Sequence, residues 1–290
     1  MRVSSAIARF LNIVAQLLLP IGRPPSRAMV AREYLVLTAK TLLFGRSCPN
    51  RVSVLGRLVS PDSYALLRML FVEIFVRREY EFSSEREDPL IIDCGGNIGM
   101  ATLFFSLQYP EARIVTLEPS PGSFEALKKL KGWNGLSRLE LHNVAAAANE
   151  GERDFYYDEQ HPASVTASVV AKRGGVVAVR VRTARVSTFI NERVDFLKID
   201  IEGAEMEVIE ELASSGKMVH VQQMAIEFHH HMVPNDDRMS QLLKILETQG
   251  FGYQLRTLTQ RPMHLGSFQD IMIYAYKTGA PVQEGVVATV

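Results

Sequence analysis

A glycine-rich turn between an apolar strand and a helix constrains this chain more than any other sequence feature. The run Ile91-Ile92-Asp93-Cys94 leads directly into Gly95-Gly96-Asn97-Ile98-Gly99, and a helical pattern follows. In a doubly wound sheet the first such turn is a ligand site, because glycines let the backbone approach the ligand and the helix N-terminus presents free N–H groups. The alternative without a ligand is a plain turn in which Asp93 caps the helix.

Short apolar runs alternate with helical stretches from residue 89 onward. The expected strands are residues 90–94, 113–117, 139–144, 194–199 and 219–228, and the expected helices are residues 98–108, 120–131, 204–212 and 236–249. This alternation predicts an α/β fold, a Rossmann-like doubly wound sheet that is mostly parallel and covered by helices on both faces. Residues 252–256 and 270–276 predict a terminal antiparallel hairpin, and residues 152–157, 167–170 and 176–182 predict inserted antiparallel strands.

Residues 1–78 are expected to form a mainly helical N-terminal extension or cap, and residues 79–290 the α/β domain. Helical periodicity occurs at 7–18, 32–44 and 65–75, and residues 52–59 read as a strand. The first 57 residues are strongly basic, with nine Lys and Arg against one acid, Glu33. The apolar stretch at 10–19 is too short to span a bilayer and lacks a signal-peptide cleavage pattern. We expect it to pack on the α/β domain or a partner subunit, with peripheral membrane contact as the alternative.

The composition narrows the class of protein. Lys plus Arg equals Asp plus Glu, at 32 each, which argues against a general nucleic-acid binder. Cys48 and Cys94 cannot form a disulfide framework and have no neighbouring Cys at metal-ligand spacing, so we expect reduced thiols in a cytoplasmic protein. The sequence leaves the oligomeric state open.

An acid at the end of the second strand adds a nucleoside-binding signal. Glu118-Pro119 directly follows the run at 113–117, and a carboxylate there can accept hydrogen bonds from both ribose hydroxyls. The glycine turn departs from the Gly-x-Gly-x-x-Gly pattern that binds a pyrophosphate. Asp93 before it suits the cationic amino-acid end of S-adenosylmethionine and would repel a pyrophosphate. A nicotinamide-dependent oxidoreductase and a non-catalytic nucleoside-binding scaffold remain the alternatives.

Acids and a histidine follow the later strands. Asp200 ends the strand at 194–199, and Glu227 and His229 share one side of the strand that leads to His229-His230-His231. Methyl transfer to a hydroxyl needs a base that takes the proton, and His229 is the expected base, with Asp200 or Glu227 orienting it or replacing it. A divalent metal held by Asp200, Glu227 and His229 is an alternative with suitable ligand types.

The motifs together resemble the FkbM family of methyltransferases over roughly residues 75–251. The matching segments are Asp93-x-Gly-Gly-Asn-x-Gly, Glu118-Pro, Lys198-Ile-Asp200-Ile-Glu202-Gly203-Ala-Glu205 and Ile226-Glu227-Phe-His229. The resemblance implies S-adenosylmethionine as cofactor and O-methylation of a small molecule such as a sugar, glycolipid or polyketide. The chain departs from the family at Gly96, where Ala is usual, and at residues 184–187, where many relatives carry a Leu-Asp pair.

These arguments assign roles to specific residues. The expected cofactor-binding residues are Asp93, Gly95, Gly96, Asn97, Gly99, Glu118, Asn143, Val144, Ala145 and Asp200, with residues 143–145 beside the adenine. The expected catalytic residues are His229, Asp200 and Glu227. Tyr80 is expected near the cofactor, and the acceptor pocket is expected to come from residues 1–78 and 152–182.

Overall fold

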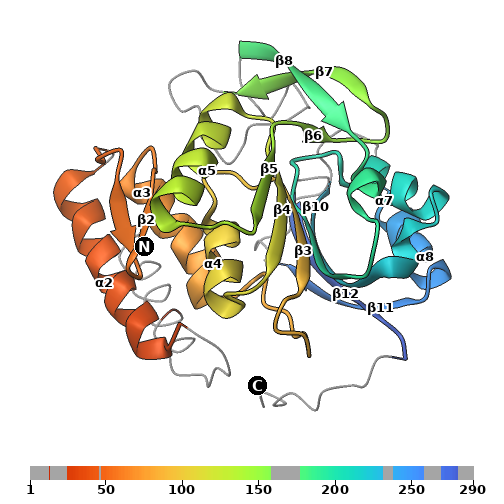
Figure 1. The fold of residues 1–290 in the computed structure, drawn as a ribbon, viewed down its shortest axis with the longest axis horizontal. Helices are drawn as coiled ribbons and strands as arrows, with labels where there is room; N and C mark the ends of the chain where they lie inside the picture. Colours follow the sequence, from red (N-terminus) through yellow and green to blue (C-terminus); the bar gives the residue numbers. More distant parts are fainter. Residues whose placement is uncertain are drawn as a thin grey trace, which may run out of the picture.

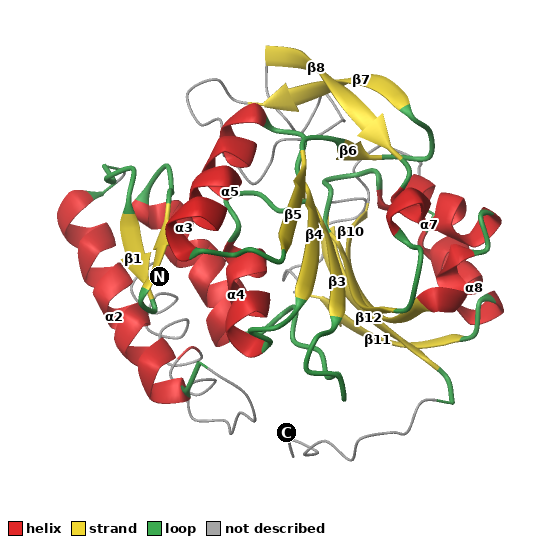
Figure 2. Ribbon diagram, viewed as in Figure 1, coloured by secondary structure: helices red, strands yellow, loops and turns green. Residues whose placement is uncertain are grey.

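A seven-stranded sheet forms the centre of the molecule (Figures 1 and 2). The computed structural model describes residues 13, 25–45, 47–157, 177–230, 238–257 and 269–279. The strand order is β11-β12-β10-β9-β3-β4-β5. The strands are β3 (Leu90–Cys94), β4 (Arg113–Leu117), β5 (Leu139–His142), β9 (Val194–Ile199), β10 (Val221–His230), β11 (Phe251–Thr257) and β12 (Gln269–Lys277). The strands from β10 to β5 are parallel, and the β11–β12 hairpin pairs antiparallel with β10. The mostly parallel fold with a terminal hairpin is therefore confirmed.

Helices cover both faces of this sheet (Figure 2). They are α4 (Met100–Gln108) and α5 (Pro121–Asn134) on one face, and α7 (Glu205–Ser214) and α8 (Met239–Thr248) on the other. Alternate side chains of a strand point to opposite faces. Accordingly, Ile91 joins the apolar cluster under α4 and α5, while its neighbour Ile92 joins the cluster under α7 and α8. Burial on both faces explains why the central strands read as continuous apolar runs.

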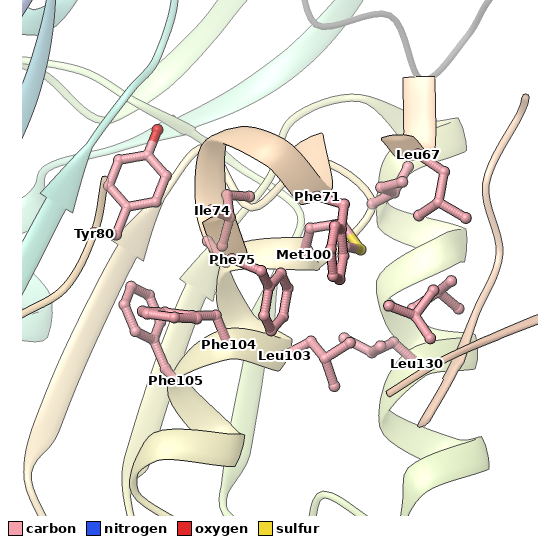
Figure 3. Packing of buried hydrophobic residues seen from close by; sticks show 14 of the residues in the cluster. Leu67, Phe71, Ile74, Phe75, Tyr80, Met100, Leu103, Phe104, Phe105 and Leu130 are labelled. Atoms are coloured by element: carbon pink, nitrogen blue, oxygen red, sulfur yellow. The ribbon is translucent and has the colours of Figure 1, made fainter. Parts of the chain in front are cut away.

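The N-terminal segment packs against α4 and α5. It comprises α2 (Arg27–Phe44), β1 (Val52–Val54), β2 (Arg57–Val59), α3 (Tyr64–Phe71) and a π-helical turn, η1 (Val72–Val76). Figure 3 shows its apolar side chains interleaved with those of α4. Phe71 and Phe75 stack at 5.1 Å between ring centroids, and Phe75 meets Phe104 of α4 edge-on at 5.3 Å. The described part of this segment therefore shares one hydrophobic core with the sheet.

The expected single strand at 52–59 is wrong, because the chain turns back in its middle. Leu55 and Gly56 both have positive φ, at 51° and 78°, and Val54 pairs with Arg57 across the turn. Positive φ at both central residues is the geometry of a two-residue hairpin turn. The expected helix at 7–18 lies outside the described residues, apart from Ile13, which is helical and half-buried against the core.

A small three-stranded sheet is inserted after β5, above the carboxyl ends of the parallel strands (Figure 1). It contains β6 (Ala145–Ala146), β7 (Gly151–Tyr157) and β8 (Val177–Ala184), in the order β6-β8-β7. Two short 3₁₀ turns, η2 (Val186–Phe189) and η3 (Lys217–His220), precede β9 and β10. The expected strand at 167–170 lies outside the described residues. Among the described helices, none is long and apolar enough to cross a bilayer.

Candidate active site

A cavity of about 260 Å³ lies at the carboxyl ends of the parallel strands. The strand ends place the glycine turn after β3, Glu118 after β4, Asp200 after β9 and Glu227 on β10 around it. The N-terminal segment closes another side with Met69, Leu70, Glu73 and Ile74, and the inserted sheet contributes Ala145, Ala146 and Phe155. The edge where ligands bind in a doubly wound fold is thus enclosed by both of the segments that we expected to shape an acceptor pocket.

The glycine turn fits against β9 and β4 without room for side chains. Gly95 has φ +87°, and a Cβ there would lie 1.9 Å from the backbone oxygen of Asp200. The N–H groups of Gly95 and Gly96 donate to the Leu117 carbonyl at 2.9 and 3.1 Å. A Cβ on Gly96 would lie 2.2 Å from the Thr116 methyl carbon, which explains why this chain has Gly at the position where Ala is usual.

Glu118 lies between the glycine turn and the start of α5. Its two carboxylate oxygens accept hydrogen bonds from the N–H groups of Asn97, at 2.7 Å, and Ser120, at 2.8 Å. Each oxygen keeps a second lone pair, so the carboxylate can also accept from two ligand hydroxyls in the cavity. Burial raises the pKa of Glu118 to about 7, against the opposing effect of the two N–H groups.

Asp93 does not line the cavity and instead forms an ion pair behind the turn. It is fully buried, accepts from the Thr102 hydroxyl at 2.9 Å, and lies 3.3 Å from the Lys198 ammonium. Lys198 also donates to the Gly95 carbonyl at 2.8 Å and lies 3.4 Å from Asp200 Oδ2. Burial opposes the charge of Lys198, but Asp200 and Asp93 outweigh it and raise the pKa of the ammonium. Lys198 is therefore a permanent cation that fixes the turn.

The Tyr80 hydroxyl lies between two acids of the cavity. It donates to Asp200 Oδ2 at 3.0 Å and lies 3.4 Å from Glu227 Oε2. Figure 3 shows its ring beside the phenylalanine cluster and its hydroxyl pointing away from it. Burial opposes ionisation of Asp200, but Lys198 and His229 lower its pKa. Burial and the charge of Asp200 raise the pKa of Glu227 well above its usual value. The pair thus combines a stable carboxylate with a carboxyl group that holds a proton more tightly.

His229 is buried between two glutamates beside the cavity. Its Nδ1 lies 2.9 Å from Glu205 Oε1 and its Nε2 lies 3.0 Å from Glu202 Oε2. Burial favours the neutral ring, but Glu205 and Glu202 outweigh it and raise the pKa of His229 well above its usual value. Both ring nitrogens thus face glutamates, and His229 is not among the residues that line the cavity. Its role as the base stays a prediction.

The structure brings together some of the expected residues and separates others. Those that line the cavity are Gly95, Gly96, Asn97, Glu118, Ala145, Asp200 and Glu227. Those that do not are Asp93, Gly99, Asn143, Val144 and His229. Gly99 begins α4 with φ +89°, and the Asn143 side chain donates to the Glu118 carbonyl at 2.8 Å, so both support the cavity from behind. Direct contact of any of these residues with a ligand stays a prediction.

Three acids of the cavity had no expected role, namely Glu202, which the sequence placed only in the family motif, and Glu73 and Asp270. Glu73 comes from the π-helical turn, and Asp270 comes from β12, where it pairs with His229 across an antiparallel ladder. No local motif marks either residue, because helical periodicity treats Glu73 as a solvent-facing position and strand pairing brings Asp270 in from far along the chain. The cavity is consequently more acidic than the sequence motifs suggested.

Two groups of side chains in the described ranges bring three donor atoms within 4.8 Å of one another. They are Asp200, Glu202 and His229, and Glu227, His229 and Asp270. Both include His229, whose two nitrogens face Glu205 and Glu202. A metal in either group would have to take a ring nitrogen that now faces a glutamate. A metal at this place therefore stays an expectation from the sequence.

The mostly parallel sheet, with the glycine turn and Glu118 at the carboxyl ends of its strands, defines a doubly wound, Rossmann-like α/β fold. The Methyltransferase FkbM domain matches residues 93–255, which is more than half of the chain. The chain belongs to this family.

Two methyltransferases are similar to this chain over about half of its length. Methyltransferase 1 from Beauveria bassiana (strain ARSEF 2860) is 27% identical over 171 residues, covering 52% of this chain and 69% of the relative. Methyltransferase sdnD from Sordaria araneosa is 28% identical over 174 residues, covering 49% of this chain and 67% of the relative. The crystal structure of methyltransferase FkbM from Methylobacillus flagellatus KT is similar to this chain with a TM-score of 0.45 and 16% identity. The alignment covers 85% of this chain and 58% of the chain in that structure.

Proposed function

We propose that this protein is an S-adenosylmethionine-dependent O-methyltransferase that acts on a hydroxyl group of a small molecule, such as a sugar, glycolipid or polyketide. The observation that carries the proposal is the position of Glu118. Its carboxylate faces the same cavity as the glycine turn and the acids Asp200 and Glu227. An acid that can hold a ribose, a turn that lets a ligand approach the backbone and further acids in the same cavity suit a nucleoside methyl donor and a proton acceptor.

The cavity residues fit the cofactor. Gly95 and Gly96 leave space that a side chain would fill, and Glu118 offers two acceptors for ribose hydroxyls. Asp200, kept ionised by Lys198, suits an ammonium group of the ligand. Ala145 lines the cavity, and its small side chain leaves room for the adenine ring of the cofactor. When bound, S-adenosylmethionine would supply an electrophilic methyl group on its sulfonium.

Glu227 is the group best suited to accept the proton of the substrate's hydroxyl. It lines the cavity, and burial together with the charge of Asp200 raises its pKa, so its ionised form accepts a proton more readily than an ordinary carboxylate does. Tyr80 holds Asp200 through a hydrogen bond and so keeps that carboxylate beside Glu227. His229, as a cation paired with Glu205 and Glu202, balances part of the negative charge of the acids. We therefore move the role of base from His229 to Glu227.

The test is mass spectrometry of glycosides, glycolipids and polyketides incubated with the protein and S-adenosylmethionine. The proposal predicts a gain of one methyl group on an oxygen, and a much smaller yield of that product with Glu227→Gln. Methylation on nitrogen or carbon would replace the O-methyl assignment. Reduction or oxidation of a substrate with a nicotinamide cofactor would instead favour the oxidoreductase alternative.

A further inference from the structure

Helix α2 exposes an unusual amount of apolar surface. Leu42 is 82% exposed and Leu43 is 76% exposed. Three other large apolar side chains of this helix are also more than half exposed: Met29, Leu35 and Phe44. Single exposed leucines are ordinary on a protein surface, but a group of them on one element indicates a binding surface.

Leu35, Leu42 and Leu43 lie on the side of α2 that faces away from the rest of the molecule, whereas the Phe44 ring packs on Tyr64 at 6.0 Å between centroids. Val30, Tyr34 and Leu37 point the other way and are buried in the core shared with α3. Leu35 and Leu42 are seven residues apart, so they lie one above the other on the outer face. In Figure 1 this helix forms the outer edge of the molecule, on the side opposite α8. The helix is thus apolar on its inner and outer faces alike.

The surroundings of this face are basic. Between residues 25 and 71, the described residues include six Lys and Arg and only two acids, Glu33 and Asp62. The first 57 residues carry nine bases and one acid, a net charge of +8. Because the whole chain carries 32 of each sign, the remainder has a net charge of −8. The positive charge is concentrated on the segment that carries the exposed leucines.

We propose that the outer face of α2 docks on an anionic lipid surface. Exposed apolar side chains with Lys and Arg close by are the features by which a surface helix binds the interface of a charged bilayer. Leu42 and Leu43 enter the acyl boundary at the end of the helix, and Arg32 contacts the headgroup phosphates. An acidic surface of a second copy would match the charge but not the apolar side chains.

The position of α2 ties this surface to the cavity. Helix α3 packs on α2 and continues into η1, and together they contribute Met69, Leu70, Glu73 and Ile74 to the cavity wall. Docking through α2 therefore holds one wall of the cavity close to the bilayer. The inference concerns where the protein sits and does not depend on the reaction proposed above.

The test is flotation of the full chain with vesicles of phosphatidylcholine, with and without phosphatidylglycerol. We expect binding to the anionic vesicles and little to the neutral ones. The double variant Leu42→Ser, Leu43→Ser lowers the partition coefficient by about tenfold or more. Arg32→Gln lowers it by about fivefold, on anionic vesicles only.

Val219→Ser provides the matched control, because Val219 is 63% exposed on η3, away from α2. This variant should bind vesicles as the parent does. Unchanged melting temperatures separate lost docking from lost folding. Absence of vesicle binding by the full chain overturns the proposal, as does equal binding by the double serine variant. Concentration-dependent dimerisation that the serine variant abolishes, without vesicle binding, would assign the face to a second copy instead.

Discussion

The Lys198 ammonium lies 3.3 Å from Asp93 Oδ1, and the two residues stand opposite each other on the paired strands β9 and β3. This ion pair is almost fully sealed from water, with side-chain exposures of 2% and 0%. It joins the glycine turn to the acid-bearing end of β9, since Lys198 also contacts Asp200 and the Gly95 carbonyl. The shape of the cavity therefore depends on a residue that hardly reaches its surface.

Removal of this cation should destabilise the fold. Lys198→Met leaves Asp93 and Asp200 buried without their partner, and the loss of one member of a buried ion pair costs about 3–5 kcal/mol. Urea unfolding followed by fluorescence measures the change. Lys129→Met, at an exposed position of α5, is the control and should leave stability within about 0.5 kcal/mol of the parent. Equal stability of the two variants would show that the pair is dispensable.

Glu118 should control cofactor affinity. Glu118→Ala removes the acceptor for the ribose hydroxyls and should weaken the binding of S-adenosylhomocysteine by about 1–3 kcal/mol. Calorimetric titration of both proteins gives the difference directly. Glu125→Ala on the exposed side of α5 should bind as the parent does. Unchanged affinity in the Glu118 variant would remove this residue from the ribose site.

Glu73 should make stability depend on pH. Burial, followed by the charge of Glu79, raises its folded-state pKa from 4.5 to about 7. Between these values the folded protein binds more protons than the unfolded chain, so the free energy of unfolding falls as pH rises. Glu73→Gln should therefore stabilise the protein by about 1–3 kcal/mol above pH 7 and have little effect below pH 4.5. Denaturant midpoints across this range test the sign, with exposed Glu87→Gln as control. A constant difference at every pH would contradict the assignment.

Turnover should depend on Glu227 as the proton acceptor. Glu227→Gln should lower kcat by about 10²–10⁴-fold while leaving cofactor affinity close to that of the parent. His229→Gln should lower stability, because it removes the cation between Glu202 and Glu205, but the folded fraction should keep the parent's pH profile of kcat. Mass-spectrometric assays stopped at fixed times give kcat for the Glu227 and the His229 variant. Normal turnover in the glutamine variant of Glu227, with loss in a well-folded variant of His229, would return the role of base to the histidine.

Gly96 should tolerate alanine only when its neighbour is trimmed. Gly96→Ala brings a Cβ to 2.2 Å from the Thr116 methyl carbon, and such overpacking costs about 1–3 kcal/mol. Thr116→Ser removes that methyl and keeps the hydroxyl beside Thr102. The double variant should recover most of the lost melting temperature. A double variant as unstable as Gly96→Ala alone would place the strain elsewhere.

The sheet could be predicted because its signals are local. The central strands β3, β4 and β9 are apolar runs followed by a glycine or an acid, and this pattern correctly gave the order of strands and helices around Asp93, Glu118 and Asp200. The hairpin at Leu55 and Gly56 was missed because the apolar pattern continues through the turn. The raised pKa of His229 could not be predicted, since it depends on Glu202 and Glu205 folding back onto the next strand. Asp270 reaches the cavity by strand pairing that no sequence spacing reveals.

The central claim is that the cavity beside Glu118 binds S-adenosylmethionine. Isothermal titration of the full chain with S-adenosylmethionine, and in parallel with NAD, tests it most directly. The account predicts one saturable site for S-adenosylmethionine that Glu118→Ala weakens, and no heat of binding for NAD. Binding of NAD with no binding of S-adenosylmethionine or S-adenosylhomocysteine would contradict it.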